Sequence, residues 1–129
     1  MQLFKQIKPE YTDARGDILK ILDDGKTLIK STLLITSNKG SIRANHYHKK
    51  DTHYCYMITG KMEYYEKPVG ADKSMMQKVI VEAGDVIFTP SMHEHAMRFL
   101  EDSAFLTLST ESRPSKAYEE DLVRVKLIE

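Results

Sequence analysis

The sequence has a single cysteine, few glycines and prolines, no tryptophan and no excess charge of either sign. With only Cys55, an internal disulfide is excluded, and the composition fits a reducing compartment such as the cytoplasm. Nineteen basic residues balance nineteen acidic ones without forming a basic stripe, which argues against nucleic acid as a partner. No apolar run approaches the roughly 18 residues of a membrane span, and residues 1–10 lack the apolar block of a signal peptide. We therefore expect a cytoplasmic protein with no nucleic-acid or membrane partner.

The composition is that of an ordinary globular protein. Of the 129 residues, 41% are hydrophobic and 29% are charged, and the mean hydropathy is −0.44. This is too polar for a membrane protein and too apolar for a disordered chain. The length favours one domain, 1–129, with one core.

Short segments rich in Ile, Val, Thr, Tyr and Phe recur along the chain and are broken by Gly, Pro, Asp and Asn. This spacing is typical of an all-β sandwich or barrel. We expect a core barrel over about 17–110, with a tight hairpin corner at Gly60. A short helix or turn is expected at 116–121, and the N-terminal segment and a last strand at 122–128 are candidate edge or dimer elements. The predicted barrel strands are 17–22, 27–36, 41–47, 53–59, 61–67, 76–81, 85–89, 95–99 and 104–110.

Three of the five histidines lie within eight residues, at His46, His48 and His53. Residues two apart in a strand share a face, so His46 and His48 lie side by side, and a returning strand brings His53 to the same interior. The segment PSMHEHAM supplies His93 and His95. Converging imidazoles suit a transition metal, although a single histidine is more often a hydrogen-bonded surface residue.

The histidine spacing resembles the two motifs of the cupin superfamily. The first motif reads Gly40, five residues, His46-Tyr47-His48, four residues, His53, six residues and Gly60. His53 stands where cupins usually have a glutamate. In the second motif Gly84, Pro90 and His95 match, whereas Met92 replaces a glycine.

The resemblance implies a cupin-type jelly-roll β-barrel with a metal inside its mouth. The implied ligands are His46, His48, His53 and His95, holding one divalent ion such as Zn, Ni, Mn or Fe. Four imidazoles contribute no negative charge, so the ion would stay a strong Lewis acid. His93 is then a rim or outer residue, and Cys55 a packed barrel residue. Many small cupins pair through edge strands, so the resemblance also implies a homodimer.

A narrower resemblance is to cupins that act on sugar nucleotides, namely 3,4-ketoisomerases, 3,5-epimerases and capsule-sugar enzymes. It rests on Arg43-Ala44-Asn45-His46-Tyr47-His48-Lys49 and on residues 13–17, for which an ordinary turn before a strand is an equal alternative. In the ketoisomerases the two histidines act as acid and base, which would give His46 and His48 these roles.

The favoured function is an isomerase or epimerase that removes a proton next to the carbonyl of a sugar or sugar nucleotide. Tyr54 and Glu94 are further candidate catalytic residues, and Arg43, Lys49 and Tyr64 are candidate substrate contacts, since Arg and Lys can bind a phosphate. One alternative is an Fe- or Cu-dependent dioxygenase, because histidine-rich cupin sites leave positions open for oxygen. The other is a cupin that binds a sugar without catalysis.

Overall fold

The strands follow the two-residue alternation of the sequence. The computed structural model describes residues 1–113 and 115–129. Along β6 (His53–Thr59) the side chains of His53, Cys55 and Met57 are buried, whereas Tyr54 and Tyr56 are partly exposed on the other face. The other strands are β1 (Gln2–Phe4), β2 (Tyr11–Asp13), β3 (Gly16–Ile18), β4 (Ser31–Ser37), β5 (Ile42–His48), β7 (Lys61–Pro68), β8 (Gln77–Glu82), β9 (Val86–Thr89), β10 (His93–Phe99), β11 (Ser103–Ser109) and β12 (Leu122–Arg124).

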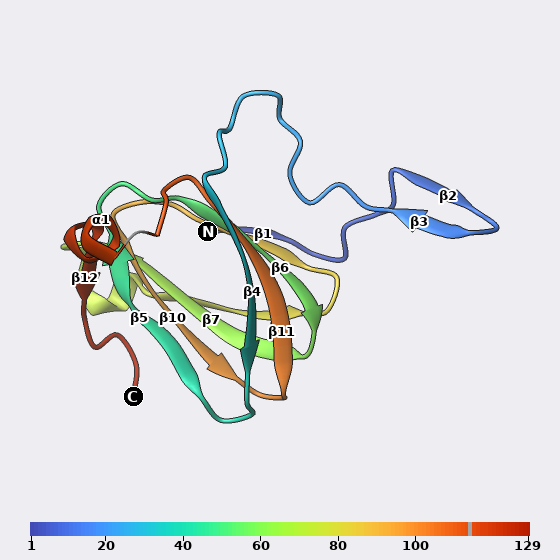
Figure 1. Ribbon diagram of the computed structural model, residues 1–129. Helices are drawn as coiled ribbons and strands as arrows, with labels where there is room; N and C mark the ends of the chain where they lie inside the picture. The colour runs from blue at the N-terminus through green and yellow to red at the C-terminus, as the bar shows by residue number, and fades with distance from the viewer. Residues whose placement is uncertain (114) are drawn as a thin grey trace.

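Two five-stranded antiparallel sheets form the body of the molecule (Figure 1). Sheet I has the order β1-β9-β6-β11-β4, and sheet II has the order β12-β5-β10-β7-β8. The two sheets face each other as a jelly roll and enclose both the core and the histidines. This confirms the predicted all-β, cupin-type fold.

The apolar core fills the end of the barrel opposite the histidines. Phe99 and Phe105 stack there with ring centroids 5.8 Å apart. At the same end Gly60 has a φ of +94°, and a Cβ on it would lie 2.1 Å from Ser103 Oγ. Gly60 therefore makes the β6–β7 corner, as predicted, and also allows the close approach of Ser103. The buried apolar residues of this core are Cys55, Met57, Met62, Tyr64, Val81, Ile87, Met97, Phe99 and Phe105.

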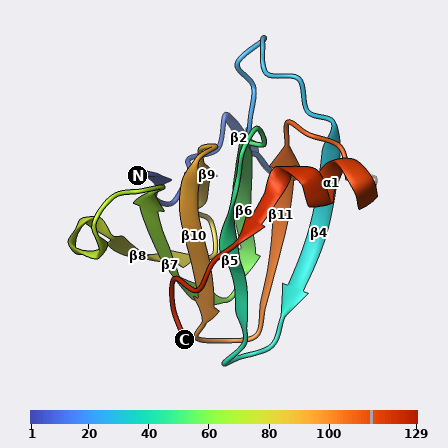
Figure 2. The same cartoon turned by 90° about the vertical axis from the view of Figure 1, so that its left-hand side faces the viewer.

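The C-terminal segment covers the outer face of sheet II (Figure 2). Helix α1 (Ser115–Asp121) agrees with the predicted helix and leads into β12, which pairs with β5. Leu127 and Ile128 then pack against Tyr65 and Ala96. The predicted strand 122–128 is shorter than expected, ending at Arg124. In the segment that follows, the backbone amides of Leu127 and Ile128 donate hydrogen bonds to the side chain of Asn45 and not to a neighbouring strand.

The N-terminal region differs most from the sequence prediction. Strand β1 was not predicted, and it pairs with β9 at the edge of sheet I. The predicted strand 17–22 is replaced by β3, which pairs only with β2 in a short hairpin, and the predicted strand 27–36 begins at Ser31 as β4. Residues 7–30, which we call the arm, carry this hairpin away from the barrel (Figure 1).

The hairpin turn at the end of the arm is stabilised locally. The Asp13 carboxylate accepts hydrogen bonds from the backbone and guanidinium of Arg15. Residues 13–16 therefore form a turn, and none of them lines the histidine pocket. The only short 3₁₀ turn among the described residues is η1 (Lys73–Met75). No helix in the described part of the chain is long and apolar enough to cross a membrane.

Candidate functional site

A β-bulge places His46 on the inner face of sheet II. Ala44 and Asn45 both have left-handed backbone conformations, with φ of +67° and +54°. The pairing of β5 with β10 shifts by one residue at this point, so that His95 pairs with His46 and Ala96 pairs with Ala44. A bulge of this kind changes the direction in which the following side chains point. Asn45 tolerates this conformation better than most residues, and its side chain holds the C-terminal segment.

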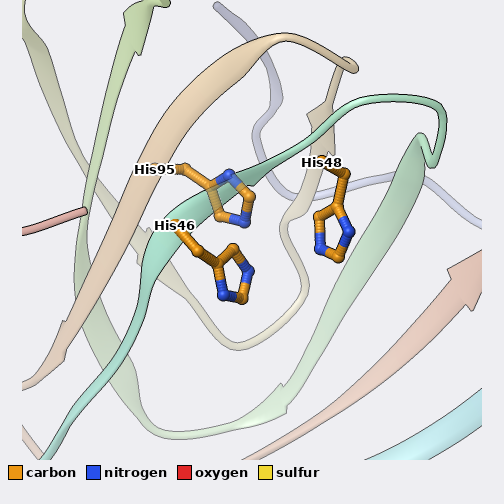
Figure 3. A group of neighbouring side chains, drawn as sticks. All are labelled: His46, His48 and His95. Atoms are coloured by element: carbon orange, nitrogen blue, oxygen red, sulfur yellow. The ribbon is translucent and has the colours of Figure 1, made fainter. Parts of the chain in front are cut away.

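Four imidazoles converge inside the barrel mouth. The ring centroid of His46 lies 4.8 Å from that of His48 and 4.7 Å from that of His95. The His53 ring reaches in from sheet I, 5.4 Å from the His95 ring and 5.8 Å from the His48 ring. Figure 3 shows the rings of His46, His48 and His95 turned into the same enclosed space. The structure therefore brings all four predicted histidines together from three strands.

The Nδ1 atoms of three of these rings are already engaged in hydrogen bonds. His48 Nδ1 lies 2.9 Å from the Asp121 carboxylate, and His53 Nδ1 lies 3.0 Å from the Asp51 carboxylate. His95 Nδ1 lies 3.1 Å from the backbone carbonyl of His93. Each bond leaves Nε2 as the free ring nitrogen. A carboxylate or carbonyl behind an imidazole is the usual outer partner of a metal-binding histidine.

Burial favours the neutral form of three of the clustered imidazoles, His46, His48 and His95, by lowering the pKa of each. Desolvation and the neighbouring histidines lower the pKa of His46 to about 3. The same causes lower the pKa of His95 well below its usual value. For His48 burial outweighs the opposing hydrogen bond from Asp121, so its pKa is lowered too. Neutral imidazoles with a free Nε2 are competent metal ligands.

The donor atoms form two overlapping groups, each spanning no more than 4.8 Å. One group is His46, His48 and His95, and the other is His48, Asp51 and His53. The first is an all-nitrogen set that fits a divalent transition ion. His53 shares the second group with His48 and Asp51, and the binding of one ion by all four histidines stays a prediction. These residues could hold a metal, and the donor set does not specify which one.

The histidines line a cavity of about 410 Å³ whose lining includes several cations. The Arg43 guanidinium lies toward the apolar end of this cavity, donating to Ser37 Oγ at 2.7 Å and to the carbonyl of Thr36 at 2.9 Å. Arg113 lies over the ring of Tyr118, 4.2 Å from its centroid. Acidic side chains line the same cavity, so the cavity offers both signs of charge. The basic residues lining it are Lys30, Arg43, Lys49, Lys50 and Arg113.

Three predicted site residues lie elsewhere. Tyr54 alternates with the inward residues of β6, and its ring packs on Phe88 on the outer face of sheet I. Glu94 is paired with Lys67 at 2.6 Å and does not line the cavity. Tyr64 is inside the barrel but fully buried beneath His95, where its hydroxyl bonds to Glu66 and Thr89. The strand period explains the placements of Tyr54 and Glu94, since a residue next to an inward histidine in sequence faces the opposite side.

The remaining candidates have structural surroundings. His93 belongs to neither donor group. Its Nδ1 lies 3.0 Å from the backbone carbonyl of Ser91, and its own backbone carbonyl is the hydrogen-bond partner of His95 Nδ1. Cys55 lines the inner end of the cavity beside Thr107, and burial raises the pKa of its thiol to about 12. At neutral pH Cys55 is therefore a protonated thiol and not a nucleophile.

Sequence reasoning missed the two carboxylates that orient the histidines. Asp51 lies two residues before His53, and its proximity offered a local signal. It also accepts a hydrogen bond from the backbone of Glu111 at 3.1 Å. Asp121 is the last residue of α1 and accepts from the backbone of Lys50 at 2.7 Å as well as contacting His48. No sequence pattern links Asp121 to a histidine 73 residues away.

Solved structures share this fold at low sequence identity. QdtA, a sugar 3,4-ketoisomerase from Thermoanaerobacterium thermosaccharolyticum in complex with TDP, matches with a TM-score of 0.75 and 18% identity over 97% of this chain and 88% of that chain. A dTDP-4-dehydrorhamnose 3,5-epimerase from Sulfolobus tokodaii matches with a TM-score of 0.71 and 18% identity over 92% of this chain and 75% of that chain. The capsular polysaccharide assembling protein CapF from Staphylococcus aureus matches with a TM-score of 0.61 and 15% identity over 73% of this chain and 26% of that chain.

A family model completes the comparison. No curated protein matches this chain significantly. The structural likenesses establish a cupin-like fold of the kind seen in sugar-nucleotide ketoisomerases and epimerases. The model of the polysaccharide biosynthesis C-terminal domain matches residues 11–121, which include every histidine of the cluster. The chain therefore belongs to the polysaccharide biosynthesis C-terminal domain family.

Proposed function

We propose that this protein is a metal-binding cupin that isomerises or epimerises a nucleotide-linked sugar by removing a proton next to a carbonyl group. The observation that carries the proposal is the convergence of His46, His48, His53 and His95 on one cavity that is also lined by cations. Membership in a polysaccharide biosynthesis family supports a sugar substrate. The ketoisomerase and epimerase folds support this reaction class.

In this proposal His46, His48 and His95 hold the metal ion. When bound, a divalent ion supplies a Lewis acid for the oxygen of a neighbouring carbonyl. His53 stands apart from this set, and its hydrogen bond to Asp51 at 3.0 Å fixes the imidazole with Nε2 free. His53 can then accept the proton, while Asp51 stabilises the imidazolium that forms.

The cavity suits an anionic substrate. Arg43 is held by Ser37 and Thr36, and a guanidinium held in this way can bind a phosphate through two parallel hydrogen bonds. Lys49 and Lys50 line the cavity from the β5–β6 loop. We assign the cations that line the cavity to the diphosphate of the substrate and the histidine cluster to its sugar.

The test is solvent deuterium exchange. The tag-free protein is incubated in D₂O with TDP-4-keto-6-deoxyglucose, a compound present in one QdtA structure, and the sugar is examined by NMR. We expect deuterium at a carbon next to the carbonyl, lost in His53→Asn and retained in the matched control His93→Asn. Elemental analysis of the same preparation should give about one metal ion per chain.

Each other result has a defined meaning. Binding of several keto sugars without exchange or turnover would replace catalysis by sugar binding. Oxygen consumption with a coloured or EPR-active metal would replace isomerisation by dioxygenation. Exchange in a protein that contains no metal would leave His46 and His48 as acid and base and remove the metal from the proposal.

A further inference from the structure

Strand β5 carries one more residue than the strand beside it. It has two residues, Ala44 and Asn45, opposite the single residue Ala96 of β10. Arg43 and His46 lie on either side of this bulge, and both line the cavity. In a regular strand, residues three apart point to opposite faces. The extra residue therefore lets β5 present Arg43 and its two histidines to the same cavity.

The bulge has a backbone conformation that residues other than glycine rarely adopt. Both Ala44 and Asn45 lie in the left-handed region, with φ of +67° and +54°. Two such residues in succession persist only where the surrounding contacts hold them in place. Ala44 has only a methyl group to offer, whereas the side chain of Asn45 can donate and accept hydrogen bonds. The contacts of Asn45 therefore decide whether the bulge is maintained.

The C-terminal segment supplies those contacts. The Oδ1 atom of Asn45 accepts hydrogen bonds from the backbone amides of Leu127 and Ile128, both at 3.1 Å. Its Nδ2 atom donates to the backbone carbonyl of Ile128 at 3.0 Å. The backbone carbonyl of Asn45 accepts from the amide of Val125 at 2.9 Å. The bulge and residues 125–128 therefore hold each other.

The same segment is fixed along the rest of its length. Leu127 and Ile128 are buried against the outer face of sheet II. At the start of the segment, the carboxylate of Asp121 lies 2.9 Å from His48 Nδ1. Between these two attachments, β12 pairs with β5 from His46 to His48. The strand that carries these two histidines is therefore held between β10 and the C-terminal segment.

We propose that Asn45 is a positioning residue of the metal site, because it ties the C-terminal segment to the bulge and so keeps His46 directed towards His48 and His95. The inference rests on the proposed function, in which these three histidines hold the ion. Asn45 does not line the cavity itself, so it acts through His46. Metal binding and docking of the segment are then coupled, and each favours the other to the same extent.

The first experiment compares Asn45→Ala with Gln6→Ala by zinc titration calorimetry. Gln6 is a matched control at the closed end, since it is also an amide residue with a left-handed φ, +47°, and its side chain donates to the carbonyl of Ala83 at 2.8 Å. We expect the zinc Kd to rise by about 10- to 100-fold in Asn45→Ala and to stay unchanged in Gln6→Ala. The visible spectrum of the Co²⁺-loaded protein, which reports ligand geometry, should change only in Asn45→Ala.

A second variant, Asn45→Gly, separates the backbone conformation from the side-chain contacts. Glycine adopts a positive φ without strain but has no side chain to hold residues 127 and 128. We expect zinc binding to weaken in this variant as well. Wild-type affinity in Asn45→Gly would remove the C-terminal segment from the proposal. An unchanged Kd in Asn45→Ala, or an equal rise in Gln6→Ala, would overturn the proposal as a whole.

A measurement on the metal-free protein distinguishes this inference from the proposed function. The rings of His46 and His95, whose centroids are 4.7 Å apart, should give nuclear Overhauser contacts. These contacts should disappear in Asn45→Ala and persist in Gln6→Ala. With that result, a wild type that binds no zinc would contradict the proposed function and leave the positioning role intact. Contacts that persist in Asn45→Ala would overturn the positioning role, whatever the wild type binds.

Hydrogen exchange tests the coupling on the wild type and needs no variant. Circular dichroism shows whether each substituted chain is folded, and this measurement decides the case if Asn45→Ala is not. Zinc should slow the exchange of the amides of Val125, Leu127 and Ile128, which the bulge holds. Equal exchange of these amides with and without bound zinc would show that the segment and the metal site are not coupled.

Discussion

The two ends of the barrel are built from different side chains on the same strands. Along β6 the inward residues change from His53 to Met57, and along β10 they change from His95 to Phe99. The closed end is apolar and tightly packed, whereas the open end is a cluster of buried imidazoles around a cavity. The apolar end fixes the positions of the strands, and the open end uses those positions for chemistry. If the two roles are separate, a substitution at one end should leave the property of the other end unchanged.

The largest effect is expected from Phe105→Ala at the closed end. Phe105 is 2% exposed and stacks on Phe99, so its loss leaves a cavity in the core. We expect the free energy of unfolding to fall by about 3 to 5 kcal/mol, measured by urea denaturation. The metal affinity of the molecules that remain folded should not change. An equal loss of stability in His46→Ala would show that the two ends are not separate.

The second prediction concerns the open end. His48→Ala removes a residue shared by both donor groups and should abolish most metal binding. The loss should exceed the roughly 10- to 100-fold that follows removal of an outer partner. Zinc titration calorimetry measures it, and His93→Ala is the control. If His46→Ala and His48→Ala both retain full metal occupancy, the ligand assignment is wrong.

The third substitution, Asp85→Asn, changes a buried polar residue at the closed end of the barrel. Its buried carboxylate accepts from the backbone amides of Gln6 and Glu82, both at 2.8 Å, and contacts Lys5. Asp85→Asn should reduce the free energy of unfolding by about 2 kcal/mol at pH 7, measured by urea denaturation.

The pH dependence of this effect has a definite sign. Burial alone would raise the pKa of Asp85, but the hydrogen bonds from Glu82, Lys5 and Gln6 hold it below the ordinary value. The carboxylate therefore stabilises the fold fully above about pH 4. That stabilisation is lost as the pH falls through the lowered pKa. Thermal melts between pH 7 and 3 should show the wild type and Asp85→Asn converging, and a constant gap would rule out the ionised carboxylate as the cause.

A smaller effect is expected from Asp51→Asn at the open end. The asparagine keeps an oxygen for the backbone amide of Glu111, so the loop should stay folded. Asp51 is itself a donor of the second group and also fixes His53, so the affinity of that group for a metal should fall by about tenfold or more. Asp72→Asn, on the exposed cap of η1, is the control. Unchanged affinity would mean that Asp51 does not act on the site.

The smallest effect is expected from Met92→Gly. Met92 has a φ of +57°, a left-handed conformation that glycine adopts more easily, and its side chain is 45% exposed. Removal of this strain should stabilise the protein by no more than about 1 kcal/mol. Chemical denaturation measures the change. A loss of stability would show that the side chain contributes packing that outweighs the strain.

The histidine motif was predictable because its information is local. The spacing of His46 and His48 within one strand puts both on one face, whatever the rest of the fold. The corner at Gly60 was also predictable from the residue type and its flanking strands. The arm was not, because residues 17–22 have a strand pattern but pair with no strand of the two barrel sheets, and only β3 forms within them, in the hairpin with β2. A strand pattern becomes a long strand only when a neighbour supplies hydrogen bonds.

The sequence predicted less well which polar residues near the histidines belong to the site. Tyr54 and Glu94 lie beside histidines in sequence, and the strand alternation turns both of them outward. Asp121 is distant in sequence, and the pairing of β12 with β5 brings it to His48. Proximity along a strand is therefore a poor guide to proximity in a site built across two sheets.

The all-β class, the turns and the inner face shared by His46 and His48 follow from the sequence, since these depend on residue type and a period of two. Only folding brings Asp121 to His48 and places the backbone of Leu127 and Ile128 against the side chain of Asn45. These features depend on contacts between residues far apart in the chain. Such contacts form only when the sheets close on each other, and no local pattern encodes them.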